Sequence, residues 1–447
     1  MTPTLTDLFA RLRAHEARAA KSFNLTPSEN RLSPLATMPF AFDAYSRYFL
    51  DDLRLFGQWC FPAGRHLGAI ERDVLHPVLK QLACSSHVNV RPISGISCMT
   101  IILAALTKPG DLVLVVPASA GGHASTRHVA ARLGAEAVDI PFRNPFDIDL
   151  DRLRDLLRDR SPRLVYIDQS TLLFPIDAKQ IRSLVDQVSP TTLIHYDSSH
   201  LNGLVLGGIV ANPLERGADS FGGSTHKTLP GPHKGFIATQ SVEISKAVEA
   251  VTDHFVSQHK MAEVTSLAIT LLEFRDCGGV RYAQQTVENA RTFAATVAER
   301  GLSVAGADRG MTDCHQVWVA AGGRKSLPEQ ATTLESAGLL VNSFPSLPSI
   351  DGPAFRLSLA EFTRMGAQRA DAQTLAHAFA DVLAGDGRGM DALQALRHKL
   401  ARVAYCWDVE SIPGLTGASM EQLLELLPSL AGAGGDVSAC ATAPTSA

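Results

Sequence analysis

Short apolar runs alternate with amphipathic stretches between about residues 75 and 240. The apolar runs with the length of buried strands lie at 112–116, 164–167 and 193–196. The stretches with apolar residues at helical spacing between them lie at 127–134, 151–159 and 177–188. Strand–helix alternation of this kind predicts a mostly parallel sheet with helices on both faces.

The pattern becomes mainly helical after residue 240. The predicted helices are 264–275, 280–300, one near 326–337 and several between 366 and 432, with strands at 317–320 and 355–359. Residues 5–21 also form an amphipathic helical pattern. We therefore expect an N-terminal arm (1–30), a large domain (31–279), a smaller C-terminal α/β domain (280–432) and a disordered tail (433–447).

Composition narrows the function classes. The 447 residues are 45% hydrophobic and 19% charged, with a net charge of −4, so no nucleic-acid footprint is expected. No apolar run approaches the ~20 residues of a membrane span, and the N-terminus lacks the apolar core of a signal peptide. The seven cysteines show neither zinc-ligand nor disulfide-scaffold spacing, so no metal site is expected. These features predict a cytoplasmic enzyme.

The clearest chemical signal is an aspartate and a lysine thirty residues apart. Asp197 ends a predicted buried strand, and Lys227 lies in a loop rich in Ser, Thr and Gly. Pyridoxal phosphate enzymes need a lysine that binds the cofactor and a carboxylate that faces its pyridinium nitrogen. Taken alone, the two residues would more commonly be a turn aspartate and a solvated lysine. The flanking residues therefore decide between that interpretation and a cofactor site.

Those flanking residues resemble the serine hydroxymethyltransferases. The segment THKTLPGP at 225–232 is similar to their cofactor-lysine motif, and YDSSHLNGLV at 196–205 is similar to their aspartate motif. Further matches, in family order, are NLTPSEN at 24–30, PISG at 92–95, GGH at 121–123 and RLSLAEFTRMG at 356–366. The resemblance implies an α/β pyridoxal-phosphate transferase of fold type I, with a large domain whose mostly parallel sheet is covered by helices and a smaller C-terminal α/β domain.

The resemblance also implies residue roles. Lys227 would hold pyridoxal 5'-phosphate as an internal aldimine, Asp197 would pair with the pyridinium nitrogen, and His123 would stack on the ring. The remaining implied cofactor contacts are Ser94, Gly95 and Ile96 at the phosphate, Ser170 and His200 at the phenolate edge, and His226. The implied substrate contacts are Ser28, His66 and Arg356. A planar guanidinium suits bidentate binding of a carboxylate.

The chain departs from these enzymes where they handle folate. Trp59 falls on the family's acid/base glutamate, His233 replaces an arginine, and 256–260 lacks the family's glycine-rich pattern. An indole has no basic lone pair and cannot relay that proton. Trp59 either forms an apolar acceptor wall or, if the alignment slips by a residue or two, is a core aromatic.

A closer resemblance is to the L-threonine transaldolases of antibiotic biosynthesis, carried by the patterns at 59–70, 168–170, 226–235 and 315–317. It implies retro-aldol cleavage of L-threonine to acetaldehyde and a glycyl quinonoid, which then adds to an aldehyde acceptor to give a β-hydroxy-α-amino acid. The base for the threonine hydroxyl could be His66, His200 or His226, which the sequence does not distinguish.

The alternatives are a hydroxymethyltransferase, a threonine aldolase or a catalytically silent cofactor-binding protein. The resemblance further implies a homodimer, with 57–66 and 256–260 near the interface.

Overall fold

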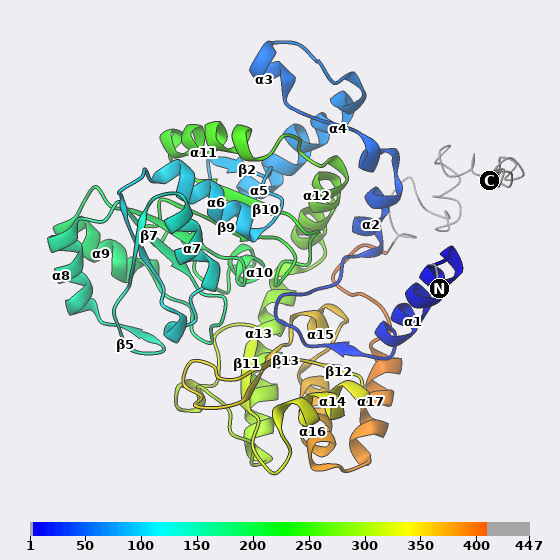
Figure 1. The fold of residues 1–447 in the computed structure, drawn as a ribbon. Coiled ribbons are helices and arrows are strands. Elements are labelled where there is room, and N and C mark those ends of the chain that lie inside the picture. The colour runs from blue at the N-terminus through cyan, green and yellow to red at the C-terminus, as the bar shows by residue number, and fades with distance from the viewer. Residues whose placement is uncertain (1–2, 409–447) are drawn as a thin grey trace, which may run out of the picture.

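The computed structural model describes residues 3–408, which contain a seven-stranded sheet (Figure 1). In sheet order its strands are β2 (His87–Asn89), β10 (Gly235–Thr239), β9 (Ser220–Ser224), β8 (Leu193–Asp197), β7 (Leu164–Asp168), β3 (Leu112–Val115) and β4 (Glu136–Asp139). Only β10 runs against the other six. The predicted mostly parallel sheet is confirmed, and the three strands expected around 112, 164 and 193 are β3, β7 and β8.

Helices cover both faces of the sheet because its strands are apolar on both sides. Along β3, Val113 and Val115 pack into one core cluster, and Leu112 and Leu114 pack into the other. The first cluster includes residues of α6 (Gly95–Leu106), α7 (Ala124–Arg132) and α11 (Val242–Phe255). The second includes residues of α8 (Leu150–Arg160), α9 (Ala178–Val188) and α12 (Met261–Asp276). This two-sided burial is typical of parallel sheets.

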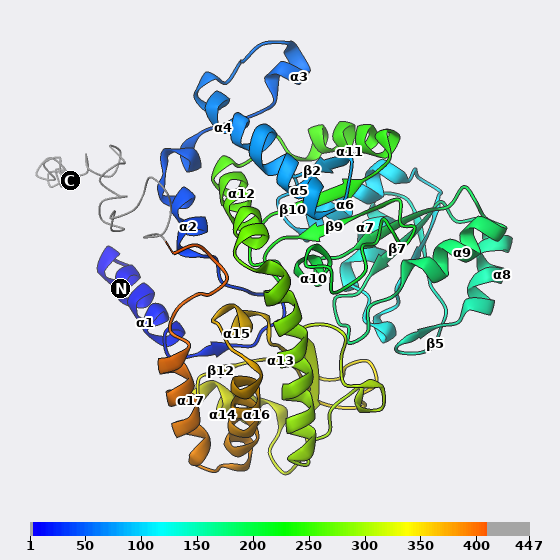
Figure 2. The ribbon, with the colours of Figure 1, turned by 180° about the vertical axis from the view of Figure 1, so that it is seen from behind.

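A smaller unit follows in the C-terminal part of the chain. Its antiparallel sheet has the order β11 (Gln316–Ala320), β14 (Ala354–Ser358), β13 (Asn342–Phe344). Its helices are α14 (Leu327–Ser336), α15 (Ala360–Arg364), α16 (Arg369–Ala384) and α17 (Arg388–Lys399). The long helix α13 (Gly279–Glu299) contacts α10 (Asn202–Leu206) and α12 on the side of the large sheet and β11 and α16 in the C-terminal unit, so it runs from one unit into the other (Figure 2).

The N-terminal segment is tied to the C-terminal unit. After α1 (Leu5–Ala19), strand β1 (Phe23–Asn24) pairs in parallel with β12 (Leu339–Leu340). Phe23 and Leu25 are buried in the core of that unit. We propose a domain boundary near Gly279, where α13 begins. The expected tail at 433–447 and the expected helical region beyond residue 408 lie outside the described residues.

The remaining elements are α2 (Pro34–Thr37), α3 (Asp52–Phe56), α4 (Arg65–Ile70), a π-helical turn (Glu71–Leu75), α5 (His76–Leu82), β5 (Phe142–Asn144) and β6 (Asp147–Ile148), with short 3₁₀ turns between them. Figure 1 shows α3 on a projection above the main body. Between residues 3 and 408, no helix combines the length and apolarity that a membrane crossing requires.

Candidate active site

A cavity of about 310 Å³ lies at the carboxyl ends of β7 and β8, where open α/β sheets bind ligands. All nine residues expected to contact the cofactor line it: Ser94, Gly95, Ile96, His123, Ser170, Asp197, His200, His226 and Lys227. The other lining residues are Met99, Asp168, Gln169, Ser199, Ser224 and His233. The fold therefore brings together residues that are spread over more than 130 positions of the sequence.

One end of the cavity suits an anion. Ser94 caps α6, and its Oγ accepts a hydrogen bond from the Ser97 N–H at 3.1 Å. The N–H groups of Gly95 and Ile96 make no hydrogen bond to the described residues. A twelve-residue helix that presents free N–H groups to a cavity is a favourable phosphate site.

The carboxylate of Asp197, which also lines the cavity, is fixed by two donors. Its Oδ1 accepts from the Ser199 N–H at 2.9 Å, and its Oδ2 accepts from the Tyr166 hydroxyl at 3.1 Å. Asp168 lies beside it on β7, and burial raises the pKa of Asp168 to about 8. Thr126 donates to Asp168 Oδ2, whereas Oδ1 has no hydrogen-bond partner within residues 3–408.

Lys227 follows β9 and faces the same cavity. Burial lowers its pKa to about 8, although the neighbouring Asp197 partly opposes that shift. An amine with a lowered pKa is a better nucleophile at neutral pH. Asn30 holds the loop, because its Nδ2 donates to the Lys227 carbonyl at 2.6 Å and to the Tyr282 hydroxyl at 2.9 Å. The segment at 24–30 thus positions the lysine.

Three neutral histidines complete the wall. Burial lowers the pKa of His123, lowers that of His226 to about 3, and moves that of His200 well below its usual value. The His123 Nδ1 accepts from the Ser125 N–H at 3.2 Å. His226 stacks on His233 with ring centres 4.0 Å apart, and its Nδ1 has no partner among the described residues.

The three expected substrate contacts lie outside this wall. Arg356 is adjacent to it, because Nη1 donates to the Ser170 carbonyl at 3.0 Å and to Thr171 Oγ1 at 3.1 Å. Burial lowers the pKa of Arg356 to about 10. Ser28 is half-buried and His66 is exposed on α4, and neither lines the cavity of its own chain.

Trp59 also lies outside the cavity of its own chain. Its ring packs on Phe49, 5.7 Å between ring centres, beside the main core. Trp59 is partly buried against that core, and its role as an acceptor wall stays a proposal that requires a second chain.

The sequence analysis assigns no role to Asp168. This residue ends a buried strand, as Asp197 does on β8, and that strand-end position is the signal that could have identified it. Gln316 and His315, which contact His200 from behind, were also missed as functional residues. The pattern at 315–317 contributed to the transaldolase resemblance, but it does not predict the contact with His200, because that contact joins two units of the fold.

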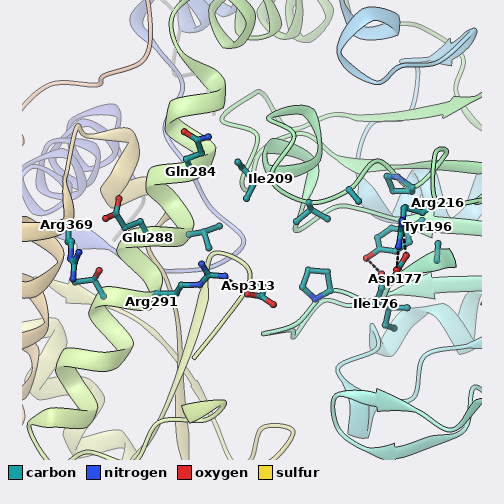
Figure 3. A pocket seen from close by; sticks show the side chains of 17 residues that line it. Ile176, Asp177, Tyr196, Ile209, Arg216, Gln284, Glu288, Arg291, Asp313 and Arg369 are labelled. Atoms are coloured by element: carbon teal, nitrogen blue, oxygen red, sulfur yellow. Dashed lines mark hydrogen bonds and ion pairs between the residues drawn. The ribbon is translucent and has the colours of Figure 1, made fainter. Parts of the chain in front are cut away.

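A larger cavity of about 760 Å³ lies elsewhere, between α13 and the loops near β8 (Figure 3). Its charged side chains are largely paired with one another. Arg216 donates to Asp177, and Arg291 donates to Asp313. It contains no lysine, so it lacks the amine that a pyridoxal site requires.

The smaller cavity fits pyridoxal phosphate. Its wall contains three buried polar atoms without partners among residues 3–408: Asp168 Oδ1, Ser224 Oγ and His226 Nδ1. Such orphaned atoms are rare in folded proteins unless a ligand or water satisfies them. Together with the α6 terminus, the carboxylate and the lysine, they match a ligand that has a phosphate, a ring nitrogen and an aldehyde.

Comparisons with known proteins agree with this geometry. The sequence model of the serine hydroxymethyltransferase family matches residues 6–377. An L-threonine:uridine-5'-aldehyde transaldolase from an Amycolatopsis species is 38% identical, over 87% of this chain and 95% of its own. A serine hydroxymethyltransferase from Staphylothermus marinus is 33% identical, over 80% of this chain and 82% of its own.

Among solved structures, the L-threonine transaldolase from Pseudomonas fluorescens in its internal aldimine state superposes with a TM-score of 0.81. The two sequences are 27% identical, and the match covers 94% of this chain and 96% of that one. The expected fold type I and the expected cofactor are confirmed. The chain belongs to the serine hydroxymethyltransferase family of pyridoxal-phosphate-dependent enzymes.

Proposed function

We propose that this protein is an L-threonine transaldolase, which cleaves L-threonine to acetaldehyde and transfers the glycyl unit to a second aldehyde. The observation that carries the proposal is the composition of the cavity. It combines Lys227, Asp197 and three neutral histidines, and Trp59 stands at the sequence position of the family's acid/base glutamate. Aldehyde exchange needs the cofactor residues but no folate-linked acid/base carboxylate. Because relatives that are 38% identical are L-threonine:uridine-5'-aldehyde transaldolases, uridine-5'-aldehyde is the first acceptor to test.

Bound pyridoxal phosphate would supply an electron sink for negative charge on the α-carbon of the amino acid. Lys227 would bind the cofactor covalently, Asp197 would keep the ring nitrogen protonated, and the Gly95 and Ile96 N–H groups would bind the phosphate. Arg356 would bind the threonine carboxylate. Support for these roles is that Lys227, Asp197, Gly95 and Ile96 line one cavity and that Arg356 donates to the carbonyl of Ser170, another residue of its wall.

The hydroxyl proton of threonine needs an acceptor. His226 is better suited than His200, because the His226 Nδ1 is unpartnered within the described chain and the His200 Nδ1 lies at hydrogen-bond distance from Gln316. His66 could act only from another chain, since it does not line the cavity of its own. We propose that His226 accepts a hydrogen bond from the threonine hydroxyl; with a pKa of about 3 it is too weak a base to keep that proton.

The deciding experiment incubates the purified protein with L-threonine and a panel of aldehydes that includes uridine-5'-aldehyde, without folate. We expect acetaldehyde release and new β-hydroxy-α-amino acids. The second candidate, a serine hydroxymethyltransferase, is favoured by the 33%-identical relative from Staphylothermus marinus. Strong stimulation of serine-to-glycine conversion by tetrahydrofolate, with no aldehyde exchange, would establish that candidate. Acetaldehyde and glycine without exchange products would identify a threonine aldolase.

We also propose a cytoplasmic homodimer that makes a building block for antibiotic biosynthesis. Support for the dimer comes from exposed apolar side chains. Helix α1 has no buried residue and exposes Leu5, Leu8, Phe9 and Leu12. The segment 45–61, which includes the projecting α3, exposes Tyr45, Tyr48, Leu53, Leu55, Phe56 and Phe61. Covering these groups would remove apolar surface from water, and a partner could then deliver His66.

A further inference from the structure

The buried side-chain amide of Gln316, in the C-terminal unit, contacts two residues that line the cofactor cavity, Ser170 and His200. Gln316, at the start of β11, is fully buried, and its Oε1 lies 3.3 Å from Trp318 Nε1 and 3.4 Å from the Leu172 nitrogen. Both of these groups are N–H donors that cannot accept a hydrogen bond. They therefore fix which end of the amide is the oxygen.

The NH₂ end of Gln316 consequently faces two acceptors. It lies 3.0 Å from the Ser170 carbonyl, which can only accept, and 3.3 Å from His200 Nδ1. The second N–H of the amide thus points at Nδ1 of His200. That nitrogen must carry a lone pair rather than a proton, since otherwise two N–H groups would oppose each other in a buried place.

His315 reinforces the same arrangement. Its Nε2 lies 3.4 Å from His200 Nδ1, and its Nδ1 lies 2.7 Å from Ser358 Oγ. Ser358 Oγ already accepts from the Ala360 N–H at 3.1 Å, so its own hydroxyl proton is free to bond His315 Nδ1. Because His200 Nδ1 is an acceptor, the facing Nε2 of His315 carries the proton and supplies a second donor towards His200, while His315 Nδ1 accepts from the Ser358 hydroxyl.

We infer that Gln316 is a positioning residue that holds neutral His200 in the tautomer with its proton on Nε2. His200 stays neutral because it is buried and because the charged or titratable groups facing it are Lys227, Arg356, His315 and His123, of which the first two carry positive charge. No described residue accepts from its Nε2, and His200 lines the cavity. The site thereby gains a fixed hydrogen-bond donor.

The use of that donor rests on the proposed function, whereas the tautomer itself does not. An N–H in the cavity suits an anionic oxygen of a bound ring better than a lone pair would. Because Gln316 belongs to β11 and His200 follows β8, the donor is set only when the C-terminal unit is docked against the large sheet.

The test is nitrogen NMR of the full-length holoenzyme with ¹⁵N-labelled histidine, His200 being assigned from the missing signals of His200→Asn. We expect His200 to show a pyrrole-type Nε2 and a pyridine-type Nδ1. Gln316→Glu, which replaces the facing donor by an acceptor, should move the proton to Nδ1. Gln316→Leu should raise the Nδ1–H population by about fivefold, the effect of one ordinary hydrogen bond.

The matched control is Gln330→Leu, which removes another buried amide of the same unit whose Nε2 donates to Gly322 and Lys325 carbonyls. This control should leave the His200 signals unchanged. A pyrrole-type Nδ1 in the unmodified protein would overturn the inference, and so would a His200 tautomer that Gln316→Glu leaves on Nε2. Neither result depends on turnover, so a failed aldehyde-exchange assay leaves this test intact. The unmodified protein decides the tautomer even if a variant fails to fold.

Discussion

Asp168 and Asp197 occupy facing positions at the ends of the adjacent parallel strands β7 and β8. Their surroundings differ. Asp197 is held by the Ser199 N–H and the Tyr166 hydroxyl, whereas one oxygen of Asp168 has no partner in the described chain. Burial, with the nearby Asp197 charge adding to it, raises the pKa of Asp168 to about 8. Asp168 therefore keeps its proton at neutral pH, which avoids two like charges side by side.

This pair predicts a pH-dependent effect of Asp168→Asn. The folded-state pKa of about 8 exceeds the unfolded value of 3.8, so folding stability from this group falls as pH rises between those values. The amide of Asp168→Asn cannot ionise. The Tm of this variant relative to the Tm of the unmodified protein should therefore rise by roughly 2 °C or more between pH 5 and pH 8. Asp159→Asn, at an exposed site on α8, is the control and should show a constant difference. A gain that shrinks with rising pH would contradict this assignment.

The second prediction concerns which lysine binds the cofactor. Burial lowers the pKa of both Lys227 and Lys234 to about 8, but only Lys227 lines the cavity. The Nζ of Lys234 instead donates to the His259 carbonyl at 2.9 Å. Borohydride reduction followed by peptide mapping should place the pyridoxyl group on Lys227 alone. A label on Lys234 would show that access to the cavity does not decide attachment.

A third prediction uses a glycine that leaves room for Asp197. Gly223 has φ +133°, and a Cβ there would lie 2.2 Å from Ser199 Oγ and 2.7 Å from Asp197 Oδ1. Gly223→Ala should displace the carboxylate and weaken cofactor binding by about tenfold or more, the loss of a charged hydrogen bond. Gly208→Ala, where φ is also positive but the Cβ meets nothing, is the control. Equal cofactor affinity in both variants, measured by titration, would argue against the tight contact.

The fourth prediction tests the proposed carboxylate site. Arg356→Lys keeps the positive charge but loses the planar fork, so KM for L-threonine should rise roughly ten- to hundredfold. Cofactor affinity should change much less. Arg216→Lys, in the separate larger cavity, is the control and should leave KM unchanged. An unchanged KM in Arg356→Lys, measured by steady-state kinetics, would remove Arg356 from substrate binding.

The fifth prediction concerns assembly. If α1 packs on a partner, Leu8→Glu should weaken the dimer, because Leu8 is 52% exposed in the single chain and would be buried in the interface. Sedimentation should show a dimer for the unmodified protein and a larger monomer fraction for the variant. The control for the added charge is Arg11→Glu, which lies on α1 as Leu8 does. Leu302→Glu is unsuitable as a control because Leu302 packs against a core. A monomer with full activity would contradict the dimer.

Features that depend on near neighbours along the chain could be predicted from the amino-acid sequence. The alternation of apolar runs and amphipathic stretches predicted β3, β7 and β8 and the helices around them, because burial on both faces leaves a local signature in the chain. Lys227 and Asp197 were identified because each stands in a short run of characteristic residues. The family resemblance then implied the cofactor, and the nine expected cofactor contacts do share one cavity.

The contacts between distant segments became known only from the folded chain. The Asn30 amide bonds the Lys227 carbonyl across 197 positions, and Gln316 bonds His200 across 116. The raised pKa of Asp168 and the packing of Trp59 on Phe49 likewise depend on burial. The periodicity of a sequence encodes which side of an element is apolar, but it does not encode which polar groups are enclosed together. Which polar groups are enclosed together follows from the docking of the C-terminal unit on the large sheet. There, desolvation determines the charge state of the buried groups, and every buried donor requires an acceptor.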